Sequence, residues 1–195
     1  MNAGAGRPRN EAIDRAVIEA TQRHLARYGY AAMSLVAVVE EAGTTRQALY
    51  RRWPTKADLA TSAITALDRA EERTATDDPF ADLVAELESF KRGVFRPNGI
   101  SMVGTMLQDS VDPELRRLYR ARIVRPRRAR LRAILQRGVA SGALRPDADL
   151  DVAVTMLTGS WYGRELAGDP VPRHWARRVA ALVWRALGGE PPEQP

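Results

Sequence analysis

The sequence contains no cysteine, only two lysines and few aromatic residues, which make up 6% of the chain. Without cysteine it can form no disulfide, no thiolate nucleophile and no cysteine-based zinc site. It has no run of about 18 apolar residues, so we expect no membrane-spanning helix. The first ten residues have no apolar core, so we expect no signal peptide. Together these features favour a cytoplasmic protein.

Motifs for common enzyme chemistry are also missing. The chain has no phosphate-binding glycine loop, no dinucleotide-binding glycine motif, no G-x-S-x-G elbow and no metal-ligand spacing. His24 and His174 are far apart in sequence, and neither lies near a nucleophile motif. We therefore predict no catalytic residues, no metal site and no cofactor, and a protein that is not an enzyme.

Arginine dominates the charge. Lys and Arg total 30 against 24 acidic residues, which gives a formal net charge of +6. Residues 1–56 carry nine basic and five acidic side chains, so most of the excess lies there. This balance favours an anionic partner, most simply nucleic acid, although GC-rich coding also enriches arginine.

Residues 34–59 have the pattern of two short helices joined by a tight turn. Ser34 can cap a helix that ends near residue 41, and Gly43 can adopt the left-handed conformation that the turn requires. Thr45 can cap a second helix over about 46–52. Two short helices in this arrangement form a helix-turn-helix.

Further residues continue this pattern at fixed offsets: Ala42-Gly43, Thr45, Leu49-Tyr50, Trp53, Pro54, Lys56 and Leu59. The set resembles the DNA-binding domain of tetracycline-repressor (TetR) family regulators. The resemblance implies a homodimeric repressor that leaves its operator when a small-molecule inducer binds. An activator or a ligand-independent regulator of the same fold remains open, as does a helical adaptor.

Apolar residues recur at helical spacing along the chain, and no strand-like alternation is present. We predict an all-α fold of about nine helices, with an N-terminal three-helix DNA-binding domain and a larger helical domain. After the connecting helix, the predicted helices cover 79–94, 100–110, 114–141 (with a candidate kink at Pro126), 149–166 and 172–187. The predicted domains are a mobile basic arm (1–9), a helix-turn-helix domain (10–56), a connecting helix (57–76), a ligand-binding and dimerisation domain (77–188) and a disordered tail (189–195).

The recognition helix of a helix-turn-helix reaches base edges from its N-terminal end. At this end, Arg46 can read guanine and Gln47 can read adenine. Tyr50 and Lys56 resemble the residues that contact phosphates in TetR family regulators. A basic arm can reach the minor groove, although the first nine residues also fit a disordered leader. The predicted DNA-binding residues are Arg7, Arg9, Ser34, Thr45, Arg46, Gln47, Tyr50, Arg51 and Lys56.

The last two predicted helices carry more large apolar residues than two solvated helices need. In the TetR family the corresponding helices pack against their twin, and a two-fold dimer matches a palindromic operator. The alternative is that these residues only close the core of the monomer. The predicted dimer residues are Trp161, Tyr162, Trp175, Val179, Leu182 and Val183.

The family resemblance also implies an inducer pocket among the middle helices, where the composition favours an apolar or aromatic ligand. A methionine and aromatic stripe more often forms plain core. The predicted pocket residues are Leu87, Phe90, Met102, Met106, Tyr119 and Trp161.

Residues 116–145 contain eleven arginines and no acidic residue. Three interpretations compete. The segment can be a solvated helix that pairs with acidic residues elsewhere, a site for an anionic ligand or acidic partner, or an additional attraction for DNA.

Overall fold

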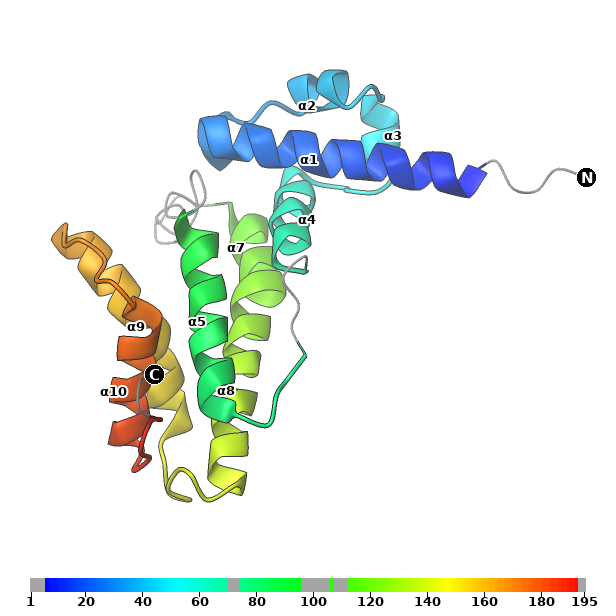
Figure 1. Cartoon of the computed structure of the whole chain (residues 1–195). Coiled ribbons are helices and arrows are strands. Elements are labelled where there is room, and N and C mark those ends of the chain that lie inside the picture. The colour runs from blue at the N-terminus through cyan, green and yellow to red at the C-terminus, as the bar shows by residue number, and fades with distance from the viewer. Residues whose placement is uncertain (1–5, 70–73, 96–105, 107–111, 193–195) are drawn as a thin grey trace, which may run out of the picture. The chain divides into compact units, whose positions relative to one another are not determined.

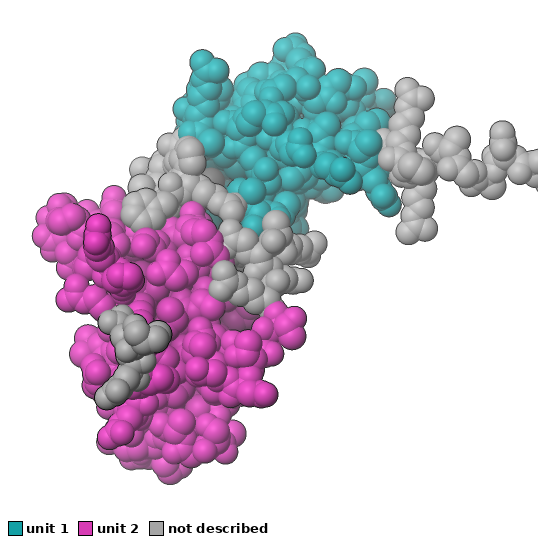
Figure 2. All heavy atoms as spheres, in the orientation of Figure 1, with its two compact units in different colours: residues 1–72, 94–124 teal, residues 73–93, 125–195 magenta. Residues whose placement is uncertain are grey.

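The computed structural model describes residues 6–69, 74–95, 106 and 112–192, and every regular element among them is a helix (Figure 1). The predicted all-α fold is therefore confirmed. The chain divides into two compact units (Figure 2). The first comprises residues 1–72 and 94–124, and the second comprises residues 73–93 and 125–195. None of the helices in the described ranges is long and apolar enough to cross a membrane.

The first unit is built on its longest helix, α1 (Gly6–Ala32). α2 (Leu35–Glu41) lies along one side of α1, and α4 (Lys56–Arg69) meets α1 from the other side (Figure 1). The short α3 (Arg46–Tyr50) packs on α2. One apolar core joins these helices, and it includes the fully buried side chains Val17, Ala20, Val38, Leu49, Leu59 and Ala63.

The start of α1 differs from the prediction. The helix begins at Gly6, so residues 6–9, which we expected in a mobile arm, are helical. Pro8 is compatible with this start, because the N–H that proline lacks has no partner in the first turn of a helix. The side chains of Arg7 and Arg9 lie outside the described part of the structure. Gly29 (φ 70°, ψ 176°) interrupts the helix near its C-terminal end.

Residues 94–124 belong to the first unit, although the sequence predicts that they are part of the second domain. Leu115 and Leu118 are three residues apart on α7 (Pro113–Tyr119), and both are buried in the same core as Leu59. Spacing within a helix identifies these leucines as a buried face, but not which neighbour covers that face. The predicted helix over 100–110 lies outside the described residues apart from Met106.

The predicted long helix over 114–141 is divided into three parts. After α7 comes a π-helical turn, η1 (Arg120–Val124), and then α8 (Arg125–Ala140). Pro126 explains the irregularity, because it has no N–H to donate to the carbonyl four residues earlier and its ring crowds that carbonyl. The wider π turn is one of the known ways in which a helix accommodates such a residue. The candidate kink at Pro126 is thus a change of helix type in the turn before it.

The second unit contains most of α5 (Pro79–Phe95), together with α8, α9 (Leu150–Ala167) and α10 (Trp175–Ala186). α9 packs against both α8 and α10. Aromatic rings fill its centre: Trp161 lies 5.2 Å from Trp175 and 6.3 Å from Phe90, centroid to centroid. Residues 189–192, predicted as a disordered tail, fold back on α10. The Gly189 amide donates to the Trp184 carbonyl at 3.0 Å, and Arg177 donates to the Pro192 carbonyl at 2.7 Å.

Many arginines of the 116–145 segment pair with carboxylates. Asp82 is the most enclosed of these partners, because it accepts from Arg137 and also from the amide and hydroxyl of Thr76. Partial burial raises the pKa of Asp82, but the bonds from Arg137 and Thr76 outweigh burial and lower it. This pairing supports the interpretation of a solvated, ion-paired helix. Other pairs are Arg117–Glu114, Arg122–Asp58, Arg127–Glu86, Arg130–Glu86, Arg132–Asp151 and Arg145–Asp147.

Candidate nucleic-acid interface

The helix-turn-helix is formed by α2, α3 and the turn between them. Ser34 precedes α2, and its hydroxyl accepts from the amide of Ala37 at 3.4 Å. Thr45 precedes α3, and its hydroxyl accepts from the amide of Ala48 at 3.2 Å. Each hydroxyl satisfies an amide that has no partner within its helix. The structure thus has both helix caps at the residues that the sequence predicts.

The turn itself is a Schellman motif. Gly43 has φ 63°, and its amide donates to the carbonyl of Glu40 at 3.2 Å. The amide of Thr44 donates to the carbonyl of Val39 at 3.0 Å. These two bonds are the pair that defines the motif, and the left-handed conformation favours glycine. The turn directs the chain from α2 into α3.

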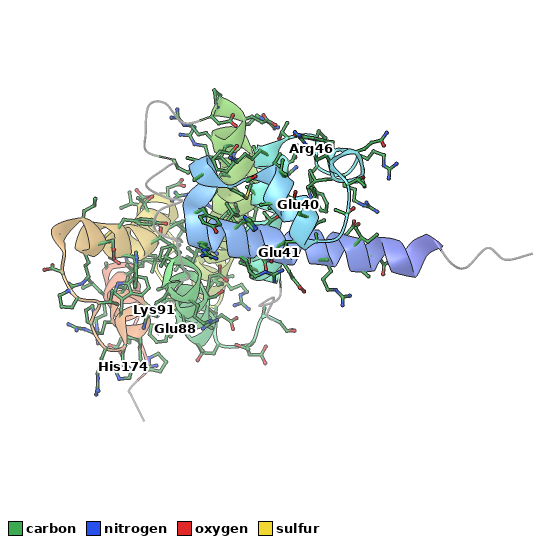
Figure 3. All side chains as sticks on the ribbon, turned by 90° about the horizontal axis from the view of Figure 1, so that it is seen from above. Glu40, Glu41, Arg46, Glu88, Lys91 and His174 are labelled. Carbon is green, nitrogen blue, oxygen red and sulfur yellow. The ribbon has the colours of Figure 1, made fainter. Side chains whose placement is uncertain are left out.

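α3 has one buried side and one exposed side. Leu49 is 2% exposed and belongs to the core of the first unit, whereas Tyr50 is 40% exposed. Arg46, Gln47 and Arg51 are also exposed, and Figure 3 shows the Arg46 side chain at the start of α3. The recognition helix predicted from sequence therefore presents its polar residues to solvent.

Arg52 follows α3 and takes a different role from its neighbour Arg51. Its Nε lies 2.6 Å from Oδ1 of Asp14 on α1, and its side chain is only 20% exposed. This ion pair holds the end of the recognition helix against α1. The sequence does not identify the pairing, because Asp14 and Arg52 are 38 residues apart and each resembles an ordinary surface charge.

Lys56 begins α4 and is only partly exposed. Its Nζ donates to the carbonyl of Ala31 at 3.0 Å and lies 5.0 Å from the centre of the Tyr30 ring. Burial lowers the pKa of Lys56. Thr55 caps this helix, because its hydroxyl accepts from the Asp58 amide at 3.0 Å.

Tyr30 connects Lys56 to a distant part of the chain. Its hydroxyl donates to Oδ2 of Asp112 at 2.9 Å, and Asp112 is also the N-cap of α7. Burial is the main reason that the pKa of Tyr30 is raised, and the bond to Asp112 and its charge add to the effect. Our sequence interpretation missed this contact. An Asp-Pro pair such as Asp112-Pro113 commonly begins a helix, but the bond from Tyr30 to the second carboxylate oxygen of Asp112 has no sequence signal.

A second missed contact lies at the end of α2. Glu41 accepts from Arg23 Nε at 2.5 Å and lies 2.9 Å from Nε2 of His24, and both partners are on α1. The bonds from Arg23 and then His24 lower the pKa of Glu41. Figure 3 shows Glu40 and Glu41 together near the end of α2. This pair of contacts fixes α2 on α1 and so helps to position the turn.

The predicted pocket residues are divided between the two units. Met106 and Tyr119 pack against the core of the first unit. Leu87, Phe90 and Trp161 are buried in the second unit, and Met102 lies outside the described residues. The six residues therefore do not form one cluster within either unit.

The predicted dimer residues also separate into two groups. Trp161, Trp175 and Val183 are at most 2% exposed within the unit itself. They are buried in the core of their own unit and present little surface to a partner copy. Leu182 is 63% exposed, and Tyr162 and Val179 are intermediate. A hydrophobic helix pattern does not reveal which of its residues face an internal neighbour.

The two halves of the chain match two family models. Residues 17–63 match bacterial regulatory proteins of the tetR family, and residues 74–183 match the tetracyclin repressor-like C-terminal domain. A regulator from Bacillus subtilis (strain 168), named the uncharacterized HTH-type transcriptional regulator YdeS, is 27% identical over 190 residues and 96% of each chain.

Solved structures agree with these matches. The TetR family transcription regulator SCO0332 is 30% identical, with a TM-score of 0.69 over 92% of this chain and 99% of that one. A TetR regulator from Haloarcula marismortui shares the fold at 20% identity, with a TM-score of 0.69 over 91% and 98% of the two chains. The chain therefore belongs to the TetR family and is a transcriptional regulator with a DNA-binding N-terminal domain.

Proposed function

We propose that this regulator is a homodimeric repressor that binds a palindromic operator and releases it when a small apolar or aromatic molecule binds. The observation that carries the proposal is the exposed polar side of α3. The buried Leu49 anchors this helix in the core, and Thr45 caps its N-terminus. A protein that acts on operator DNA works in the compartment that holds the DNA, which supports the predicted cytoplasmic location.

In this proposal α3 enters the major groove. Arg46 and Gln47 lie in its first turn, where side chains of a recognition helix reach base edges. Tyr50 and Arg51 are exposed further along and suit phosphate oxygens. Ser34 and Thr45 precede helix N-termini, where amides and the helix dipole favour phosphate. Lys56 adds a cation, and Arg7 and Arg9 lie on the first turns of α1.

The proposed dimer surface is an exposed apolar stripe on α9. Val152 and Met156 are 53% and 49% exposed, and Leu166 is 85% exposed. Between them lie Gly159 and Gly163, where an added Cβ would meet nothing within 4 Å. The spacing of these five residues alternates between four and three, as in the seam of two packed helices. Leu182 on the neighbouring α10 extends the same kind of surface.

The proposed ligand site lies in the aromatic centre of the second unit. Trp175 is 1% exposed, and its indole Nε1 is buried without a hydrogen-bond partner among the described residues. A buried donor without a partner is unfavourable, so a ligand acceptor here would gain a bond. The rings of Phe90 and Trp161 contact Trp175, and Tyr162 contacts Phe90. These neighbours support an aromatic ligand that carries a hydrogen-bond acceptor.

Selection of bound sequences from a random DNA library at physiological salt tests the proposal. We expect enrichment of a palindrome, because two recognition helices related by a two-fold axis read two inverted half-sites. Enrichment of an asymmetric site would contradict the symmetric dimer. Salt-sensitive binding without any enriched sequence would contradict sequence-specific recognition.

Gln47→Ala is expected to remove discrimination at one or two base pairs of each half-site. A lost bidentate contact to a base costs about 1–3 kcal/mol of discrimination. Competition between the selected operator and its single-base variants measures this effect. Gln136→Ala, at an exposed position on α8, is the control and should keep the full preference. Unchanged discrimination in the Gln47 variant would mean that α3 is placed wrongly on the DNA.

A further inference from the structure

The first turn of α4 is held at two points by a segment that lies far away in sequence. At its start, Tyr30, whose ring contacts the first residue of α4, donates from its hydroxyl to Asp112, 82 residues along the chain. Within the first two turns of α4, Arg122 on η1 donates from Nη2 to Oδ1 of Asp58 at 2.7 Å and from Nη1 to the Thr61 hydroxyl at 3.0 Å. All five residues belong to the first unit.

The first contact point includes Lys56. The Tyr30 ring lies under the Lys56 ammonium, and the Tyr30 hydroxyl reaches Asp112. Tyr30 therefore contacts both Lys56, the cation proposed to bind phosphate, and Asp112, the N-cap of α7. Lys56 donates one of its three N–H groups to Ala31, which leaves donors for a phosphate oxygen. The Lys56 ammonium thus contacts the Tyr30 ring as well as the Ala31 carbonyl.

The second contact point depends on the π turn. Arg122 lies within η1, where the backbone departs from the α-helix of α7 and α8. Such turns are frequently found at functional sites. The guanidinium contacts Asp58, which also accepts from the Thr55 hydroxyl at 3.1 Å. Arg122 thus bonds to the same turn of α4 that Lys56 begins.

We propose that Asp112 and Arg122 are positioning residues that clamp the first turn of α4, and that operator affinity depends on this clamp being closed. The inference rests on the proposed function and adds its regulation. The clamp segment 112–124 is continuous in sequence with α8, so a change in the second unit has a covalent route to it. Opening the clamp displaces Lys56, and it weakens phosphate contacts while sequence preference is kept.

Two substitutions break the first contact point without removing a cap. Tyr30→Phe keeps the ring and loses only the hydroxyl. Asp112→Ser keeps a good N-cap for α7 but is too short to reach Tyr30. We expect each to weaken binding to the selected operator about 2- to 30-fold. The double variant should be no weaker than either single variant, because both remove the same bond.

The salt dependence of binding tells a positioning role from a structural one. Lys56→Ala should flatten the slope of log affinity against log salt by about one unit, as expected for one lost phosphate contact. Tyr30→Phe should flatten it in the same direction and add little in the Lys56→Ala background. Tyr28→Phe is the matched control, because Tyr28 is 48% exposed on the same helix. Arg122→Gln should also lower affinity, through the second contact point.

Lysine acylation followed by mass spectrometry gives a readout that needs no DNA. The chain has two lysines, so Lys91 in the second unit serves as the internal reference. We expect Tyr30→Phe and Asp112→Ser to raise the rate at Lys56 relative to Lys91. If the wild type selects no DNA sequence, the proposed function fails, and the acylation ratio still tests the clamp. An unchanged ratio, or wild-type operator affinity and salt slope in both variants, overturns the clamp.

Discussion

A glutamate in place of Met156 is expected to separate the dimer into monomers and to weaken operator binding by about 10²- to 10⁴-fold. Met156 lies in the apolar stripe of α9, next to Val152 and Gly159, and it is 49% exposed. A symmetric interface brings the same surface of both copies together. Two carboxylates would then be buried in one apolar seam without partners, which is strongly unfavourable. A monomer holds its DNA through one recognition helix and loses the gain from two linked contacts.

Sedimentation equilibrium and gel retardation measure the two parts of this prediction. Gln136→Glu introduces the same charge at an exposed position on α8 and should stay dimeric with wild-type affinity. A dimeric Met156→Glu variant would show that the α9 stripe is not the seam. A monomer with unchanged operator affinity would separate dimerisation from DNA binding and contradict the two-fold model of recognition.

The second large effect is expected at Trp175. Trp175→Ala should lower the free energy of unfolding by about 3–5 kcal/mol, as large-to-small changes in a core do. The side chain is 1% exposed, and its ring lies 5.2 Å from Trp161 and 6.1 Å from Phe90. Urea unfolding measures the loss. Arg178→Ala, on the exposed side of the same helix, should change stability by less than about 0.5 kcal/mol.

Trp175→Phe separates the ring from its N–H group. Because the indole Nε1 has no hydrogen-bond partner among the described residues, removing it should cost much less than removing the whole side chain. A cost for Trp175→Phe equal to that of Trp175→Ala would mean that the part of the indole absent from phenylalanine, its N–H and its second ring, carries most of the stabilisation. A loss for Trp175→Ala no larger than for Arg178→Ala would contradict the central place of Trp175 in the core.

The helix-turn-helix could be predicted closely from sequence because its determinants are local. Ser34 and Thr45 bond to amides three residues away, and Gly43 is the residue that a left-handed turn favours. Such contacts are visible as fixed spacings. The family resemblance rests on the same short stretch, and the two family models agree with it.

The rest of the site could not be predicted because it depends on contacts between distant segments. Tryptophan is as common at a dimer surface as in a core, so the sequence does not say where Trp161 and Trp175 lie. Their packing against Phe90 places them in the core of the second unit. Arg122 and Arg130 pair with Asp58 on α4 and Glu86 on α5, and such pairs between distant helices follow no spacing rule. Tyr30 and Asp112 gave no joint signal, because a hydrogen bond across 82 residues leaves no spacing rule.

The two segments that form the first unit are synthesised at different times, so the unit cannot fold completely at once. Its core includes Val17 near one end and Leu118 near the other, and the second contact point on α4 is supplied by Arg122. A ribosome that adds about 5–20 residues per second needs several seconds to pass from Leu59 to Arg122. During that interval the helix-turn-helix is already made, but part of its apolar core is uncovered. The nascent DNA-binding unit therefore cannot complete its fold until the segment that contains Leu118 and Arg122 has been synthesised.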